Sequence, residues 1–346
     1  MKRLTPKRRR YLMRVTQRRT ARRRRRLFLQ SEAASPRTRR VMRIGAPRIF
    51  GVVNRVNRLE LTKFLRALTR AVLVQERRVR IEFANTKSMT PGGTLLFAAE
   101  LNRIVRISKE RLLSCSFPRD DVVAQVLKHV GIFDMLGQRR DCNVTADNVK
   151  YWRAHSGSDV DGQAAGEAIL NYMARFSDPG KRAVYKGLTE AMTNCRHHAY
   201  QAERGDGLPS VNRWWMFSQE LDGQLTVAIC DLGIGIPRSL REDRAGWYGE
   251  IVAFLAKSGW TSSDGDLISA AIAIGETRTQ EKYRGKGLMD IRTVLDELGV
   301  SHQIHCISGF YFYEAKTKKA TWKTFDASIL GTLVIWQVPL PAPAPP

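Results

Sequence analysis

The sequence predicts an α/β protein with two folded domains behind a basic N-terminal tail. At 346 residues the chain is long enough for about two domains, and its 43% of hydrophobic residues support ordered cores. Strand and helix patterns alternate between residues 49 and 150, as in βαβ units. From residue 214 on, several strands separated by turn signals follow two helical segments. The two patterns differ, so we expect two modules of different topology.

Composition excludes several classes of protein. No apolar run approaches the ~18 residues of a membrane-spanning helix, and no apolar segment follows the basic N-terminus as it does in a secretory signal. The five cysteines are scattered and form no C-x-x-C pair, so neither a disulfide framework nor a zinc ribbon is expected. We therefore expect a cytoplasmic protein.

The first segment, residues 1–48, is predicted to be a disordered basic tail. It holds 19 lysines and arginines against one acid, Glu32, and so carries most of the formal charge of +25. Like charges at this density repel one another and disfavour compaction. Such a tail can bind nucleic acid or an anionic surface without reading sequence. A solvated tail that binds no particular partner is the equal alternative.

The next segment, residues 49–136, has the order of a βα module. Apolar residues recur at helical spacing over residues 59–72, and residues 79–83 alternate as a strand does. A helix is predicted to begin at Pro91, because proline is favourable at a helix start. Residues 111–117 form a second predicted strand. Asp120 and Asp121 then open a helix over residues 122–130, where acids complement the helix dipole.

Residues 49–136 resemble a STAS domain, the fold of anti-sigma-factor antagonists. The resemblance is carried by residues 81–83, by the loop to the glycines of residues 91–93, and by the closing residues 131–136. In that family the loop before the central helix often carries a phosphorylated serine. Here that loop holds Thr90, Pro91 and Gly92, so the resemblance implies a scaffold more than a phosphorylated regulator.

A second domain is expected over residues 164–340, after a connection at residues 137–163 that is rich in turn-forming residues. The sequence ends in a proline-rich tail, residues 341–346. Asp222 and Gly223 between two apolar runs are a strong hairpin signal. The predicted helices lie at 165–176, 182–203, 247–257, 266–274 and 287–298, and the predicted strands at 214–217, 225–230, 302–307, 310–314, 321–326 and 330–338.

The helix predicted at 182–203 carries an unusual polar stripe. Residues four apart share one face of a helix, so Glu190, Asn194 and His198 line up. An acid, an amide and an imidazole on one stripe suit a site that holds a metal and a polyanion. Taken alone, the stripe is better explained as the polar face of an ordinary amphipathic helix.

Two glycine-containing stretches follow along the chain. Asp231 ends a strongly apolar strand, where a carboxylate is costly unless it has partners, and Gly233 and Gly235 let the backbone approach a ligand closely. Residues 284–288, of sequence RGKGL, precede a helix and offer free N–H groups and two cations to phosphate. Neither stretch matches a P-loop or a Rossmann fingerprint.

The polar helix, the Asp231 stretch and residues 284–288 follow one another along the chain, and a final predicted strand begins at Gly331 and Thr332. Together these motifs cover residues 164–340, and their order is similar to that of a known superfamily. They resemble the ATP-binding domain shared by DNA gyrase B, heat-shock chaperone, sensor histidine kinase and MutL proteins, the GHKL or Bergerat-fold superfamily. The resemblance implies a two-layer α/β sandwich with a mixed sheet, a lid at residues 237–283, and ATP and Mg²⁺ as cofactors.

The resemblance also implies residue roles. Asn194 would bind the Mg²⁺ that bridges the phosphates, and Asp231 would accept from the adenine amine, assisted by Thr332. Glu190 stands where hydrolysing members carry the water-activating acid, and His198 where the kinase branch often has a histidine. Further nucleotide contacts are implied for Gly233 and Gly235 at the base and for Arg284, Gly285, Lys286, Gly287 and Leu288 at the phosphates.

Several functions stay open at this point. One is a regulatory ATPase or phosphotransferase that controls a protein partner through the STAS-like module. The others are a non-catalytic nucleotide sensor and a nucleic-acid-associated ATP switch that uses the tail; a homodimer is left open. His129 has none of the sequence context of a phosphoacceptor histidine. His302 and His305 would point to opposite faces of a strand, which does not favour a metal cluster.

Overall fold

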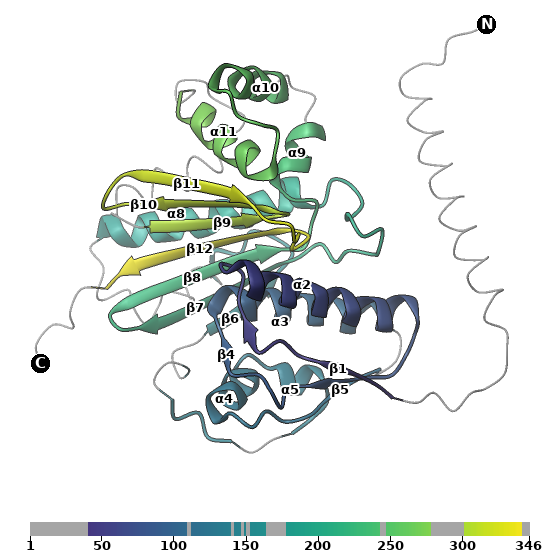
Figure 1. Cartoon of the computed structure of the whole chain (residues 1–346). Helices are drawn as coiled ribbons and strands as arrows, with labels where there is room; N and C mark the ends of the chain where they lie inside the picture. The colour runs from purple at the N-terminus through teal and green to yellow at the C-terminus, as the bar shows by residue number, and fades with distance from the viewer. Residues whose placement is uncertain are drawn as a thin grey trace, which may run out of the picture. The chain divides into compact units, whose positions relative to one another are not determined.

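The computed structural model describes residues 41–108, 112–139, 142–146, 149, 153–163, 178–242, 247–277 and 301–340 (Figure 1). Residues 41–346 belong to one unit by their internal contacts. The helices predicted at 165–176 and 287–298, residues 1–40 of the basic tail, and the proline-rich end lie outside the described residues.

The N-terminal module alternates strands and helices, as predicted. Strands β1, β3 and β5 pair in parallel in that order, and β2 pairs in parallel with β4. The Asn54 and Asp120 side chains cap helices α2 and α4 by accepting from backbone N–H groups. The elements are β1 (Met42–Gly45), β2 (Ile49–Phe50), α2 (Arg55–Thr69), the π-helical turn η1 (Arg70–Val74), β3 (Val79–Glu82), β4 (Ser88–Met89), α3 (Pro91–Ile107), β5 (Leu113–Cys115), α4 (Asp121–His129) and α5 (Ile132–Met135).

The boundary predicted for the basic tail is wrong, because folded structure begins before residue 48. Strand β1 pairs with β3, and Ile44 is buried in the core of the module. The alternation of this short strand is masked in the sequence by the arginines around it. Hydrogen bonds to β3 and burial of one side chain are enough to hold a strand at this position.

The C-terminal part is built on a sheet of seven strands in the order β11-β10-β9-β12-β8-β7-β6. Between β8 and β9, the described residues form helices α9, α10 and α11. The elements are β6 (Arg153–Gly157), α8 (Asp178–Asn194), the π-helical turn η3 (Cys195–Ala199), β7 (Trp214–Leu221), β8 (Gln224–Asp231), α9 (Ile236–Glu242), α10 (Trp247–Ser258), α11 (Asp264–Thr277), β9 (Ser301–Cys306), β10 (Gly309–Glu314), β11 (Lys319–Thr324) and β12 (Thr332–Pro339).

The mixed sheet expected here is wrong, since every neighbouring pair of these strands is antiparallel. Three of these pairs, β7–β8, β9–β10 and β10–β11, are hairpins, whose short connections permit only antiparallel neighbours. The hairpin between β7 and β8 is confirmed at Asp222 and Gly223, whose φ values of 51° and 71° are those of a tight hairpin turn.

The connection expected at residues 137–163 is wrong in part, because strand β6 lies within this segment. Its residues pair with β7 at the edge of the sheet. The sequence of β6, RAHSG, has no apolar alternation. Edge pairing rests on backbone hydrogen bonds, which leave no such pattern to read in the sequence.

Both faces of the seven-stranded sheet are covered. On β7, Trp215 and Phe217 belong to one core with α2 and α3 of the N-terminal module, whereas Trp214 and Met216 belong to a second core with α8 and α11. Strand side chains alternate between faces, so one strand supplies both cores. Figure 1 shows α2 and α3 along one side of the sheet and α8 along the other. The N-terminal module therefore packs as a layer on the sheet.

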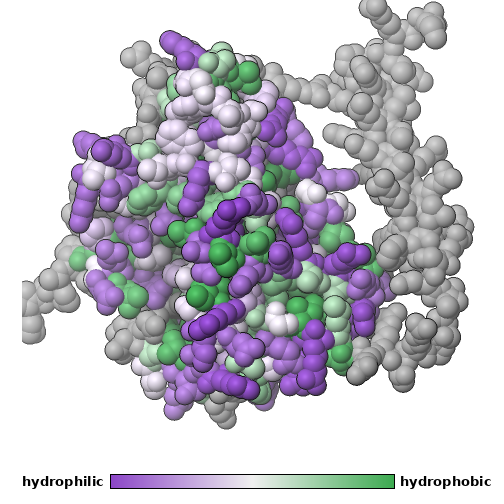
Figure 2. Space-filling model, in the orientation of Figure 1, coloured by the Kyte–Doolittle hydropathy of each residue, from purple (hydrophilic) through white to green (hydrophobic). Residues whose placement is uncertain are grey.

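The surface is mainly polar on the side shown in Figure 2. Hydrophobic residues lie there in small groups among hydrophilic ones, as on most water-exposed protein surfaces. Within the described ranges, no helix has the length and apolar character needed to cross a membrane.

Candidate functional site

Asp231 ends β8 at a point where distant parts of the chain meet. The residue is 5% exposed. Its Oδ1 accepts a hydrogen bond from the Gly233 N–H at 2.8 Å, and its Oδ2 lies 3.9 Å from the Sγ of Cys195. Thr332 is its register partner on β12. One carboxylate therefore contacts residues from three of the four predicted motifs.

Burial raises the pKa of Asp231 from 3.8 to about 6, while hydrogen bonds from Gly233, Thr332 and Cys195 limit the rise. The carboxyl is therefore mostly ionised at neutral pH. Burial and the neighbouring Asp231 raise the pKa of the Cys195 thiol well above its usual range, so this thiol stays protonated and can donate. A buried, charged acceptor of this kind suits an N–H donor on a ligand.

The helix that carries the polar stripe ends sooner than predicted. It is α-helical to Asn194 and continues as the π-helical turn η3, rather than as α-helix to residue 203. The carbonyl of Ala199, at the end of η3, accepts a hydrogen bond from the N–H of Ile234 at 2.7 Å. The wider turn thus joins the helix end to the loop after Asp231. Short π-helical segments are frequent at functional sites.

The stripe residues differ in their exposure. Asn194 is half-buried where α8 passes into η3, and its side chain makes no hydrogen bond with any residue in the described ranges. Glu190 is half-buried one turn earlier on α8. His198 lies in η3 and is exposed, as is its neighbour His197. Asn194 directly precedes Cys195, the residue whose thiol lies against Asp231.

Gly233 is required by the packing of the protein itself. A Cβ at this position would lie 2.0 Å from the carbonyl oxygen of Ala199, closer than any real contact. Only glycine lets the loop reach the helix end. The sequence predicted a close backbone approach at Gly233, and within the protein the partner in that approach is η3.

Gly235 and Thr332 both lie next to Cys306 of β9. Gly235 has a φ of +77°, and a Cβ there would lie 2.5 Å from the Cγ1 of Ile307. The Thr332 hydroxyl lies 3.3 Å from the Sγ of Cys306, which also accepts a hydrogen bond from the N–H of Ile236 at 3.0 Å. The loop after Asp231 is therefore fixed at both glycines.

The remaining predicted site residues, Arg284, Gly285, Lys286, Gly287 and Leu288, lie outside the described residues. Within the predicted lid, α9, α10 and α11 form a small core around Ile251, Leu255 and Leu267. The ring of Trp260 packs 5.6 Å from Phe254 and 4.5 Å from Trp322 between centroids. Trp247 and Tyr248 also pack against this small core.

Sequence reasoning missed the role of Tyr200. Its hydroxyl accepts from the N–H of Leu232 at 3.1 Å and donates to the carbonyl of Arg213. It thereby joins the end of η3 to the first loop residue after Asp231 and to the entrance of β7. The signal was present, since Tyr200 closes the polar helical stretch, but one aromatic residue at a helix end does not reveal its partner.

A second missed contact joins the N-terminal module to this region. Arg58 of α2 is buried and donates to the carbonyl of Ile307 at 2.8 Å and to that of Ala327 at 2.9 Å. The guanidinium of Arg58 also lies 3.2 Å from the Nδ1 of His305. Burial and the positive charge of Arg58 lower the pKa of His305 well below its usual range. His305 is thus neutral and accepts through Nδ1.

His302 packs instead beside Tyr311 and Tyr313, so the predicted divergence of His302 and His305 to opposite faces of the strand is confirmed.

The described residues contain no group of three His, Cys, Asp or Glu side chains able to hold a metal ion. A Mg²⁺ bound with a nucleotide needs only one or two protein oxygens, since phosphates and waters complete its shell. The amide oxygen of Asn194 fits that requirement. Comparison with known proteins adds no assignment: no family model matches the chain, and no curated protein shows significant similarity.

Proposed function

We propose that the chain binds ATP with Mg²⁺ at the site around Asp231 and uses the nucleotide to regulate a partner. The observation that carries the proposal is the convergence on Asp231 of Cys195, Gly233 and Thr332, which belong to different predicted motifs. A buried, ionised carboxylate next to a threonine hydroxyl is a recognition pair for the exocyclic amine of adenine. Asn194 would supply an oxygen to Mg²⁺.

The proposal includes a finer assignment of fold. The C-terminal part is proposed to be a Bergerat-type ATP-binding domain of the GHKL superfamily, and the N-terminal module a STAS-like domain. The first is supported by α8 on one face of the sheet, by the buried Asp231 at the end of β8 and by helices α9 to α11 between β8 and β9. The all-antiparallel pairing of the seven strands departs from the mixed sheet that the resemblance implies. The parallel β1-β3-β5 sheet with intervening helices supports the second.

We expect Asp231→Asn to weaken Mg²⁺-dependent ATP binding by about 10- to 100-fold. A hydrogen bond to a charged acceptor contributes about 1.5–3 kcal/mol, and each ~1.4 kcal/mol is tenfold in affinity. Asparagine keeps the shape of the side chain and removes a buried charge, so the fold should survive. Isothermal titration of the purified full chain with ATP, with and without Mg²⁺, measures the effect.

The matched control is Asp222→Asn, in the turn at the far end of β8, where asparagine tolerates the positive φ. Its ATP affinity should equal that of the parent. A second readout is pH: because the pKa of Asp231 is about 6, affinity of the parent should fall as the pH drops below that value, and the variant should lose this dependence. Equal binding by Asp231→Asn and the parent would contradict the proposed site.

The γ-phosphate of bound ATP is proposed to pass to a water oriented by Glu190, which releases ADP and phosphate, or to a side chain of the regulated partner, which releases ADP. Glu190 lies on α8 one turn before Asn194, the proposed Mg²⁺ ligand. We expect Glu190→Ala to retain ATP binding and to lose turnover by about 10²- to 10⁴-fold, the usual contribution of a general base. Phosphate release by the parent and variant measures it. A parent without turnover would favour nucleotide sensing instead.

Regulation of a partner through the N-terminal module is the last part of the proposal. Arg58 of α2 bonds to the carbonyl of Ile307, and Ile307 packs beside Gly235 in the loop after Asp231. The hydrogen bond between the two modules therefore involves Ile307, which contacts the loop that follows Asp231 at the proposed adenine site. Residues 1–48 supply a proposed contact to nucleic acid or an anionic surface through their positive charge.

A further inference from the structure

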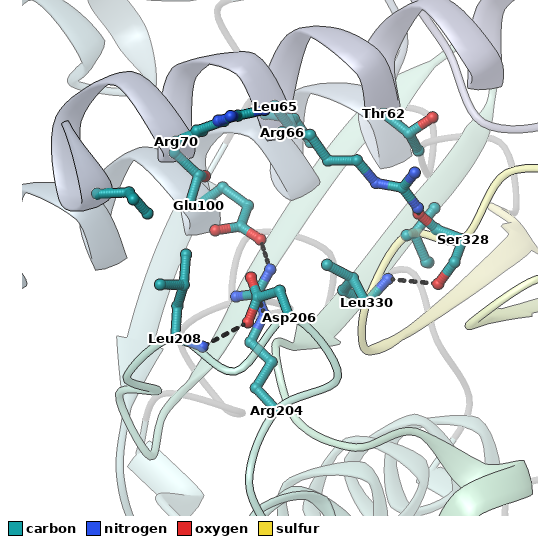
Figure 3. Close-up of a pocket in the computed structure, with 13 residues that line it drawn as sticks. Thr62, Leu65, Arg66, Arg70, Glu100, Arg204, Asp206, Leu208, Ser328 and Leu330 are labelled. Atoms are coloured by element: carbon teal, nitrogen blue, oxygen red, sulfur yellow. Dashed lines mark hydrogen bonds and ion pairs between the residues drawn. The ribbon is translucent and has the colours of Figure 1, made fainter. Parts of the chain in front are cut away.

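A second cavity lies away from Asp231, between the N-terminal module and the loops of the C-terminal part. Its volume is about 300 Å³, and Figure 3 shows residues that line it. Helix α2 supplies Thr62, Arg66 and, with η1, Arg70, while the loop after η3 supplies Arg204 and Leu208. Ser328 to Leu330, the segment before β12, forms the third wall.

Two carboxylates at this cavity are already engaged. Glu100 of α3 accepts from the Nε of Arg103 at 2.8 Å and from Arg204, and both arginines are buried. Asp206 lies 3.3 Å from the Nε of Arg204. The Nη1 of Arg204 is nevertheless buried without a hydrogen-bond partner in the described part of the protein. The guanidinium of Arg204 therefore has one N–H donor that no described residue satisfies.

Further positive charge stands on α2. Arg66 and Arg70 lie one helical turn apart and line the same cavity. Figure 3 shows Arg66 extending toward Ser328, whose carbonyl lies 3.5 Å from its Nη2. Neither arginine forms an ion pair with a residue that the structure describes. The three lining arginines therefore exceed the two carboxylates, and the local field favours an anion.

The rest of the lining is apolar. Leu65, Val74, Leu208, Ile329 and Leu330 give the cavity walls on which a hydrophobic body can pack. Small-molecule sites are typically apolar cavities of about 300–1,000 Å³ with a few fixed polar groups. A guanidinium fork matches the two oxygens of a carboxylate or phosphate.

We propose that this cavity binds a small organic anion, with an apolar body about the size of one ring and a phosphate or carboxylate group. The anionic group meets Arg66 and Arg70, and the buried guanidinium of Arg204 adds positive charge in the cavity wall. The apolar body packs between α2 and the segment at Ser328 to Leu330. This site requires no nucleotide and does not depend on the function proposed for Asp231.

The position of the cavity gives its occupant a defined neighbour. Ile329 donates to the carbonyl of Ile307 at 2.9 Å, and the N–H of Ile307 donates to that of Gly331 at 3.0 Å. Thr332, the partner of Asp231, follows directly. An occupant therefore touches the segment that carries Thr332 as well as helix α2 of the N-terminal module.

The test uses phenyl phosphate and phenylacetate as probes, titrated into the purified full chain by isothermal calorimetry, with neutral 2-phenylethanol for comparison. We expect at least one anion to bind saturably and the neutral analogue to bind at least tenfold more weakly. The two anions distinguish a phosphate from a carboxylate preference. The double variant Arg66→Gln/Arg70→Gln should weaken anion binding by about tenfold, from loss of two charged contacts.

Lys63→Gln is the matched control, since it removes a charge from the exposed side of α2 outside the cavity lining. It should leave anion binding unchanged, and saturating Mg²⁺–ATP should not displace the probe. Three results would overturn the proposal: neither anion binds, the neutral analogue binds equally well, or the double variant binds like the parent. Displacement by ATP would also overturn it, whereas failure of ATP to bind at all leaves these measurements intact.

Discussion

Replacing Glu100 with alanine is expected to lower the free energy of unfolding by about 3–5 kcal/mol, the usual cost of removing one partner from a buried ion pair. Glu100 is 2% exposed and bonds to Arg103 and Arg204, which are also buried. Without the carboxylate, two guanidiniums stay in a poorly solvated position. Asp206, with a side chain 21% exposed, is then their nearest negative charge.

Urea unfolding followed by tryptophan fluorescence measures this loss. The matched control is Glu60→Ala, which removes an exposed carboxylate from α2 and should change stability by no more than about 0.5 kcal/mol. A loss below about 1 kcal/mol for Glu100→Ala would show that the two arginines find other partners. Because α3 belongs to the N-terminal module and Arg204 to the C-terminal part, the same measurement reports on the attachment of the two.

The elements were predictable where the local signal was strong. Strands β7 and β8 are largely apolar runs, and the turn residues Asp222 and Gly223 between them have the chemistry that a tight hairpin requires. The layer formed by α2 and α3 on the sheet was not predictable. Their apolar faces indicate burial without naming the partner, and Trp215 and Phe217 read as ordinary core residues. Partner choice is a tertiary property that a single sequence does not carry.

The site was predictable to the level of motifs and no further. A polar residue at the end of an apolar strand, as at Asp231, is costly, and that cost singled it out. Its contact with Cys195, and the hydrogen bond of Tyr200 to the next residue, Leu232, depend on the π-helical turn η3, which a search at α-helical spacing does not detect. Arg58 was missed because a lone arginine in a basic chain gives no sign that it is buried.

Replacing Gly233 with alanine is expected to lower the free energy of unfolding by about 3 kcal/mol, the upper end of the ~1–3 kcal/mol cost of overpacking. The new Cβ would lie 2.0 Å from the carbonyl oxygen of Ala199. Neither the new Cβ nor the Ala199 oxygen can move by a side-chain rotation, since the position of each is set by the backbone. A hydrogen bond from the N–H of Ile234 to the same carbonyl, at 2.7 Å, holds the two segments together. Relief requires the loop after Asp231 to separate from η3.

Gly187→Ala makes the opposite prediction with the same substitution. Gly187 lies within α8, and no atom lies within 4 Å of a Cβ built there. Alanine should raise stability by about 0.5–1 kcal/mol, because glycine costs that much in a helix interior. Urea unfolding of both variants measures the pair. Similar losses of stability in both variants would mean that the close backbone approach at Gly233 is not the cause. A loss for Gly233→Ala with a gain for Gly187→Ala would show that glycine is needed at position 233 for the contact between the Asp231 loop and η3.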